Sequence, residues 1–290
     1  MVVKNIKKRA ASFSIISNGL IILFKLIAGI ITGSISIISE AIHSMSDCLA
    51  SILTFFAVVR SSMPADRDHP FGHGKYEDAA GFIEGILILL AAFYIVWEAC
   101  KKIINNNFIE FDSTIGIIVM GVAIIANLLV SSYLFSVAKK TDSVALRADA
   151  QHLSTDIYSA LGVFIGLILI KITGIAILDP LIAILVALFI LKTGISIVKE
   201  TLNNLLDGTL PDYDIKIIDN IINSCENIYG FKNLKSRKSG SNRDIDITIL
   251  CEESMTIKTC HDICDVLEAK IQDTLPNTLI TIHCEPYKRL

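Results

Sequence analysis

Long blocks of hydrophobic residues, separated by short polar stretches, occupy the first two thirds of the chain. An α-helix needs about 20 apolar residues to cross the hydrocarbon core of a bilayer. Six blocks reach that length, at residues 11–33, 37–59, 79–100, 114–136, 145–170 and 178–198. The core helix of a soluble protein can imitate one such block, but hardly six in succession. The pattern therefore predicts an all-α membrane domain of six transmembrane helices within residues 1–206.

After residue 206 the pattern changes to that of a soluble domain. Apolar positions at helical spacing predict helices over residues 212–225 and 256–275, and Pro276 ends the second of them. Alternating positions predict strands over 232–239 and 244–251, joined by a turn at Ser239–Asn242, and a short strand over 279–284. The order helix, strand, strand, helix, strand predicts a small α+β domain over residues 207–290.

The composition agrees with a membrane protein, because 52% of the 290 residues are hydrophobic and the mean hydropathy is +0.60. No cleavable signal peptide is expected, since the first apolar block is too long for the hydrophobic region of a signal and lacks a small-residue cleavage site. The tail after residue 206 is mildly acidic, which argues against nucleic acid as a partner.

Lys and Arg residues gather in the connections on one side of the predicted spans, and such connections face the cytosol. That side holds Lys4, Lys7, Lys8, Arg9, Arg60, Arg67, Lys75, Lys139, Lys140 and Arg147, against Lys101, Lys102 and Lys171 on the other. The distribution predicts a multi-pass protein of the cell membrane with both termini, and the C-terminal domain, in the cytosol. In that compartment the cysteines are expected to be reduced thiols.

Two predicted spans carry a histidine and an aspartate four residues apart, so that each pair shares one face of its helix. These pairs are His43 with Asp47 in the second span and His152 with Asp156 in the fifth. An ionisable residue at the centre of a membrane helix costs about 2.5–3.5 kcal/mol on insertion scales. If the two helices face each other, two imidazoles and two carboxylates converge, which suits a tetrahedral divalent metal, above all Zn²⁺. Interhelical hydrogen bonding alone is the simpler alternative, but it usually uses Ser, Thr or Asn.

Two further acids, Glu40 and Asp149, each lie three residues before one of these histidines. They either support the metal ligands or face water near the helix ends. The loop that follows the second span reads PADRDHPFGHGK and crowds Asp66, His69 and His73 together with Asp68. Its glycines let the chain turn, so the loop predicts a cytosolic metal site or an entry funnel for metal. The alternative is a solvated loop with capping acids.

A third group of candidate ligands lies in the tail, with His261 on the second predicted helix and His283 and Glu285 at the end of the last strand. Taken singly, each histidine is more often a surface residue. However, the chain has six histidines and all of them fall in these three groups. This distribution indicates metal binding as their common purpose.

The paired His-x-x-x-Asp motifs, together with the sequence HPFGHGK, resemble the cation diffusion facilitator family of divalent metal–proton antiporters. The resemblance covers nearly the whole chain and implies a homodimer in the lipid bilayer, with six helices followed by a cytosolic, ferredoxin-like domain similar to a metallochaperone. It implies a transport site of His43, Asp47, His152 and Asp156, a loop site of Asp66, His69 and His73, and a charge interlock of Lys75 with Asp207 at the dimer interface.

The tail departs from the family pattern. The better-known bacterial members place further histidines in the first two strands of this domain, where Lys232 and Thr248 stand here. Only His261, His283 and Glu285 keep the register. A two-metal cluster is therefore not expected; a weaker single site, helped by Cys251 or Cys284, or no site at all, is expected in its place.

The expected function is efflux of Zn²⁺ from the cytosol in exchange for protons, with Cd²⁺, Fe²⁺ and Co²⁺ as further candidates. Two His with two Asp resembles the family's zinc and cadmium pattern, and imidazole suits zinc, cobalt and iron(II). Metal binding needs neutral histidine and ionised aspartate, so it displaces protons, and the reference pKa of histidine near ~6.5 places this competition near physiological pH. A transporter of this kind is not expected to be an enzyme.

Three alternatives stay open. In the first alternative the protein is a transporter whose main substrate is Fe²⁺ or Mn²⁺. In the second the chain is a membrane-anchored metal sensor, although an anchor would not need His-x-x-x-Asp on two helices. The third is a membrane di-metal oxidase, which needs many histidine boxes, whereas only His69 and His73 lie four residues apart here.

Overall fold

The computed structural model describes residues 2–32, 35–105, 114–173, 178–225 and 227–287. Some side chains within these ranges, including those of residues 31–47, lie outside the described part. The chain divides into two compact units, Met1–Thr201 and Leu202–Leu290. The domain boundary expected after residue 206 falls shortly after this division.

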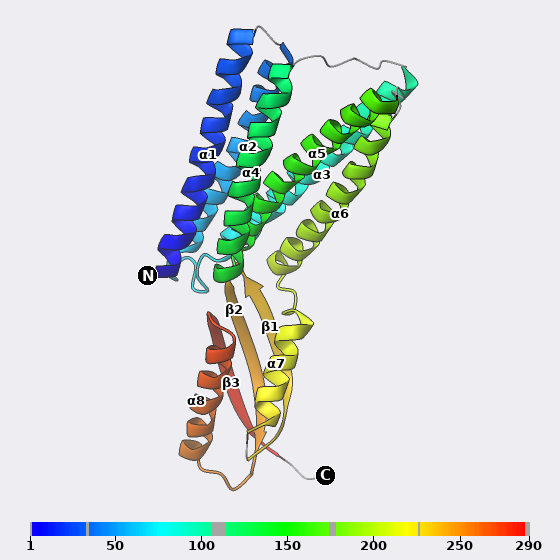
Figure 1. Ribbon diagram of the computed structural model, residues 1–290. Helices are drawn as coiled ribbons and strands as arrows, with labels where there is room; N and C mark the ends of the chain where they lie inside the picture. Colours follow the sequence, from blue (N-terminus) through cyan, green and yellow to red (C-terminus); the bar gives the residue numbers. More distant parts are fainter. Residues whose placement is uncertain (1, 33–34, 106–113, 174–177, 226, 288–290) are drawn as a thin grey trace. The chain divides into compact units, whose positions relative to one another are not determined.

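Long α-helices form the first unit (Figure 1). They are α1 (Val2–Thr32), α2 (Ile35–Ser61), α3 (Lys75–Ile104), α4 (Thr114–Thr141), α5 (Val144–Thr173) and α6 (Leu178–Leu205). Most of them continue beyond the predicted apolar block, because hydropathy marks only the apolar part of a helix while its backbone hydrogen bonds run on into polar residues. Among the described residues, Asn5–Ile27 and Lys75–Lys101 have the length and hydropathy to cross a membrane. Membrane crossing by all six helices stays a prediction.

Helix α5 lies inside the first unit. It contacts α1, α2, α3 and α4, and α1 in turn contacts α2 and α4 (Figure 1). Glycines allow α3 to pack closely on α6, since a Cβ on Gly85 would lie 2.8 Å from Cγ2 of Val198, and one on Gly194 would lie 2.8 Å from Cδ2 of Leu89. Small residues permit this close approach of helix backbones. Because α5 contacts α1, α2, α3 and α4, polar side chains on α5 are enclosed by other helices.

A buried ion pair links four helices near their ends. Nζ of Lys7 donates to Oε1 of Glu77 at 2.7 Å, and Oγ of Ser61 donates to the same oxygen at 2.8 Å. The hydroxyl of Ser143, just before α5, donates to the other carboxylate oxygen. Both members of the pair are buried. A buried carboxylate needs an opposite charge and hydrogen bonds, so Glu77 holds α1, α2, α3 and the start of α5 together.

The second unit has the predicted order of elements: α7 (Asp212–Asn223), β1 (Ile228–Ser239), β2 (Asn242–Cys251), α8 (Ile257–Thr274) and β3 (Thr278–Pro286). The sheet order is β1-β2-β3, with β1 antiparallel and β3 parallel to β2. Gly240 takes a positive φ of 60° in the predicted turn. Strand β1 begins at Ile228, before residue 232, where the alternating pattern predicts its start. Register shifts near its beginning interrupt the alternation, so the pattern does not reveal this part of the strand.

One apolar core joins both helices to the sheet. Ile218 and Ile222 of α7, and Leu267 and Ile271 of α8, pack with alternate residues of β2 and β3. These strand residues are Ile245, Ile247, Ile249 and Cys251 of β2, and Ile280, Ile282 and Cys284 of β3. Successive strand residues point to opposite faces, so the residues between them face away from the core.

Candidate metal sites

The site predicted within the membrane is described only on its α5 side. His152 is 7% exposed and Asp156 lies one turn further along the same helix, less deeply buried. Positions 43 and 47 belong to α2, but the side chains of His43 and Asp47, like that of Glu40, lie outside the described residues. Helices α2 and α5, which carry the two pairs, are in contact.

Asp149 of α5 forms a hydrogen bond with α2. Oγ of Ser51 on α2 donates to Oδ1 of Asp149 at 3.0 Å. The same hydroxyl lies 3.0 Å from Oγ of Ser14 and receives a hydrogen bond from Nδ2 of Asn18 at 2.8 Å. Between Ser14 and Ser51 either hydroxyl can be the donor, and Ser14 also hydrogen-bonds to Asp149. Asp149 is completely buried, which rules out the alternative that it faces water.

Glu84 of α3 is a buried acid that the sequence reasoning did not single out. Its side chain is 0% exposed, and Oγ1 of Thr54 on α2 donates to it. It interacts electrostatically with Asp149 and with His152, so it belongs to the same polar group. The signal was present, since Glu84 is an acid inside the apolar block 79–100. A spacing search misses it because it has no histidine partner on its own helix.

The loop residues Asp66, His69 and His73 come together as predicted. Their ligand atoms lie within 4.8 Å of one another. Nδ1 of His69 and Nε2 of His73 are each 3.4 Å from a carboxylate oxygen of Asp66. The side chain of His73 is buried, yet neither ring nitrogen has a hydrogen-bond partner among the described residues. A buried imidazole beside a carboxylate and a second imidazole matches the N/O ligand set of a divalent metal.

The surroundings of the Asp66 carboxylate favour its ionised form. Backbone hydrogen bonding from His69, above all, together with the nearby imidazoles, lowers the pKa of Asp66. The backbone N–H groups of His69 and Asp68 donate to Oδ1 of Asp66 at 2.7 Å and 3.0 Å. Asp66 therefore stays ionised as the pH falls toward mildly acidic values, and its negative charge remains available to a metal.

The tail ligands are not brought together as one group. His261 is 73% exposed and lies 3.8 Å from Asp265 on its own helix, while His283 is 67% exposed and lies 3.9 Å from Glu285. Glu285 also binds Nζ of Lys232 at 2.6 Å. Within the described part of the chain, His261, His283 and Glu285 do not form a cluster of three ligand atoms.

Four thiols gather in the core of the same unit. Sγ of Cys260 is 3.8 Å from Sγ of Cys251, and Sγ of Cys264 is 3.2 Å from Sγ of Cys284. All four are free thiols. Burial, with the neighbouring thiols, raises the pKa of Cys251 to about 11 and also raises the pKa of Cys264 and of Cys284. In the absence of metal these groups are consequently neutral near pH 7.

The two residues of the expected dimer interlock belong to different units of the chain. Lys75 is the first residue of α3, directly after the loop site. Asp207 follows α6, and its Oδ1 lies 3.3 Å from Nη1 of Arg237. Arg237 also binds Asp244 at 3.0 Å. The pairing of Lys75 with Asp207 across two chains stays a prediction.

These features are those of a helical unit that encloses acids and a histidine, with further groups of candidate metal ligands in the loop and in the second unit. The cation efflux transmembrane domain family matches residues 11–206, and the cytoplasmic domain family of cation efflux proteins matches residues 210–287. The chain belongs to this cation efflux family, that of the cation diffusion facilitators. It is a divalent cation efflux transporter and a membrane protein.

Curated relatives match almost the whole chain. The chain is 34% identical over 263 residues to the uncharacterized transporter sll1263 of Synechocystis sp. This match covers 90% of the chain and 84% of the relative. The chain is 31% identical over 278 residues to the cation-efflux pump FieF of Escherichia coli, covering 96% and 92%. Among solved structures, one of the candidate zinc transporter CzrB covers 27% of this chain and 99% of its own, at 22% identity and a TM-score of 0.27.

The loop site can be tested by a pair of neighbouring substitutions. Asp66→Asn removes the central carboxylate, whereas Asp68→Asn alters an exposed acid outside the cluster. We expect Asp66→Asn to weaken Zn²⁺ binding at the loop by about 10- to 100-fold or more, and Asp68→Asn to leave it nearly unchanged. Calorimetric titration of the detergent-solubilised chain, in an Asp156→Asn background, measures this. Equal affinities for the two variants would show that the loop is only a solvated turn.

Proposed function

We propose that this transporter exports Zn²⁺ from the cytosol in exchange for protons, through a site formed by His43, Asp47, His152 and Asp156. The main support is the Ser51–Asp149 hydrogen bond, because it sets the register of α2 against α5. The two helices run in opposite directions (Figure 1). Moving one turn backward along α2 from Ser51 and one turn forward along α5 from Asp149 reaches positions 47 and 152 at about the same level.

A second turn extends the same agreement. Position 43 lies two turns from Ser51 on α2, and position 156 lies two turns from Asp149 on α5. The register therefore brings the backbone positions of both His-x-x-x-Asp pairs to matching heights on contacting helices. At each level a histidine position on one helix corresponds to an aspartate position on the other. This is the arrangement that a four-ligand N/O site between two helices requires.

Metal selection follows from the donors. Two imidazoles and two carboxylates suit Zn²⁺, while sites with oxygen ligands alone suit Mn²⁺ or Mg²⁺. FieF, a relative, is a cation-efflux pump, and CzrB, a structural neighbour, is a candidate zinc transporter. Cd²⁺, Co²⁺ and Fe²⁺ are further candidates because they accept imidazole ligands, and Fe²⁺ is the main alternative substrate.

Proton exchange follows from the same ligands. Zn²⁺ binds only when the imidazoles are neutral and the carboxylates ionised, so metal entry releases protons and proton entry releases metal. The buried neighbours add to this competition, because Glu84 and Asp149 interact electrostatically with His152. Enclosure by α1, α2, α3 and α4 keeps these groups from bulk water, so protons reach them only as the helices open to one side.

Reconstituted liposomes test the proposed transport. With a pH dye inside the vesicles, Zn²⁺ is expected to drive proton movement through the unaltered chain. Asp156→Asn should reduce that rate by about tenfold or more, because it removes an ionised ligand. Asp273→Asn, at an exposed position of α8, is the control and should transport normally.

The outcomes separate the open alternatives. Proton movement with Fe²⁺ or Mn²⁺ but not with Zn²⁺ would keep the carrier and overturn the proposed metal. Full activity of Asp156→Asn would overturn the site. No flux with any metal would favour the membrane-anchored sensor.

We further propose that the transporter works as a homodimer with cytosolic termini, in which Lys75 of one protomer pairs with Asp207 of its partner. The match to the cytoplasmic domain family of cation efflux proteins supports this assembly. Asp207→Lys is expected to shift the detergent-solubilised protein from dimer toward monomer in light scattering, whereas Asp212→Lys, at an exposed residue of α7, should not. Addition of Lys75→Asp to Asp207→Lys should restore the dimer. A dimer unaffected by Asp207→Lys would refute the interlock.

A regulatory metal at His261, His283 and Glu285 remains only a prediction. The separate orientation of the two histidines, each exposed on its own element, gives it little support.

A further inference from the structure

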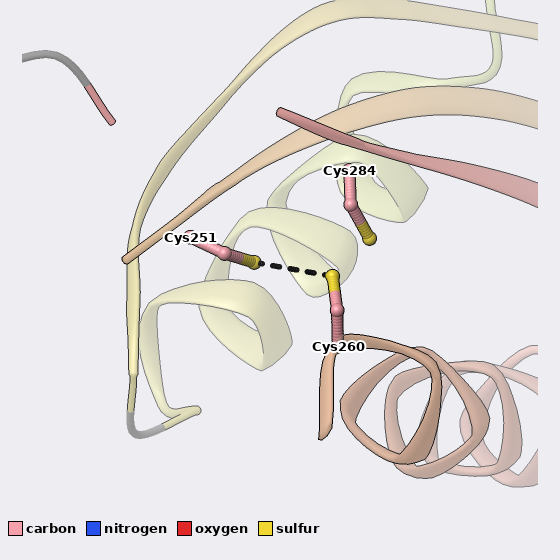
Figure 2. A group of neighbouring side chains, drawn as sticks. All are labelled: Cys251, Cys260 and Cys284. Atoms are coloured by element: carbon pink, nitrogen blue, oxygen red, sulfur yellow. Dashed lines mark hydrogen bonds between the residues drawn. The ribbon is translucent and has the colours of Figure 1, made fainter. Parts of the chain in front are cut away.

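Three elements of the second unit bring cysteines to one point. Cys251 ends β2, Cys284 is near the end of β3, and Cys260 lies in the first turn of α8 (Figure 2). Figure 2 shows the three sulfur atoms pointing toward one another, and these atoms all lie within 4.8 Å. Cys264, one turn after Cys260 on the same helix face, adds its sulfur 3.2 Å from that of Cys284.

The strand register explains this convergence. Ile249 pairs with Cys284 and Cys251 pairs with Pro286, so Cys251 and Cys284 are diagonal neighbours on the face that points into the core. Thr256 caps α8, accepting a hydrogen bond from the backbone N–H of Thr259 at 3.2 Å, and so fixes where the helix begins. That starting point places Cys260 and Cys264 over the two strand cysteines.

We infer that Cys251, Cys260, Cys264 and Cys284 form a binding site for a thiophilic divalent cation, of the Zn²⁺ and Cd²⁺ class, within the C-terminal unit. Zn–S bonds of about 2.3 Å in a tetrahedron separate the sulfurs by about 3.8 Å. The Cys251–Cys260 distance is 3.8 Å and the Cys264–Cys284 distance is 3.2 Å. The sulfurs of Cys251, Cys260 and Cys284 all lie within 4.8 Å of one another, so these three supply the first ligands, and Cys264, next to Cys284, supplies the fourth by moving toward the other two.

Simple core packing accounts less well for the cluster. Free cysteine often serves as a small buried hydrophobe. Here, however, four come from three elements and contact one another, while Cys251 alone is fully buried and the other three are half-buried. The cluster therefore includes residues that are partly exposed to solvent. On binding, a cation would displace the thiol protons and join β2, β3 and α8.

This site differs from the histidine site expected in the tail. His283 neighbours Cys284 on β3 and therefore projects from the opposite face of the sheet. His261 neighbours Cys260 but is 73% exposed. Sulfur ligands also select softer cations than imidazole with carboxylate does. The inference does not rest on the proposed transport, because none of its residues lies in the first unit.

Cadmium absorption tests the site in the reduced, full-length chain. We expect Cd²⁺ to produce a thiolate-to-metal charge-transfer band in the ultraviolet that saturates at one Cd²⁺ per chain. Cys260→Ser and Cys284→Ser should each lower the affinity by about 10- to 100-fold or more. Cys225→Ser is the matched control, since Cys225 lies in the same unit but outside the cluster, and it should leave the band unchanged. A missing band, or one that both cluster variants retain, would overturn the inference.

A second measurement needs no substitution, so it also serves if a variant fails to fold. Alkylation followed by mass spectrometry reports each thiol with and without Cd²⁺. Protection of Cys251, Cys260 and Cys284 by Cd²⁺, reversed by a chelator and absent at Cys225, supports the site. Equal labelling with and without Cd²⁺ overturns it. Protection without Cd²⁺ that only a reductant removes would identify disulfides and would overturn it as well.

Discussion

The hydrogen bond between Ser51 and Asp149 is the interaction on which the account of the membrane unit depends. An acid inside an apolar bundle must find its partner on another helix, because no water is available to it. Asp149 finds Ser51, and Ser14 and Asn18 complete the environment of that hydroxyl. The contact joins α1, α2 and α5, and the proposed register of the two His-x-x-x-Asp pairs rests on it. Glu84 reaches the same region from α3 and is held by Thr54.

Two kinds of metal chemistry are kept apart in the chain. Histidine and aspartate occur together on α5 and in the loop, and imidazole and carboxylate are ligands that suit a borderline metal and lose it when they are protonated. Sulfur ligands gather only in the core of the second unit, among the residues that the structure describes. A transported ion has to leave its site again, which favours the exchangeable N/O ligands. A thiolate site holds its metal more firmly and suits an ion that stays bound in the domain.

The sequence was informative wherever a single element carries the signal. Helical spacing placed His152 and Asp156 on one face, and a short loop confined Asp66, His69 and His73 to one place. The order of elements in the tail was confirmed, because alternation, the turn at Gly240 and Pro276 each act locally. It was less informative where partners come from different elements. Glu84 needs α2 and α5 to explain it, and the cysteine cluster depends on the parallel register of β2 with β3. Cys284 and His283 point to opposite faces of the sheet, because successive residues of a strand alternate.

In the proposed transport site one metal ion binds between α2 and α5. Anomalous diffraction at the zinc absorption edge, from crystals of the zinc-loaded chain, tests this most directly, because it locates the ion without any assumption about its ligands. We expect a zinc peak between the two helices, beside His152 and Asp156 and one turn from Asp149. Zinc peaks confined to the loop and the C-terminal unit, with none between α2 and α5, would contradict it.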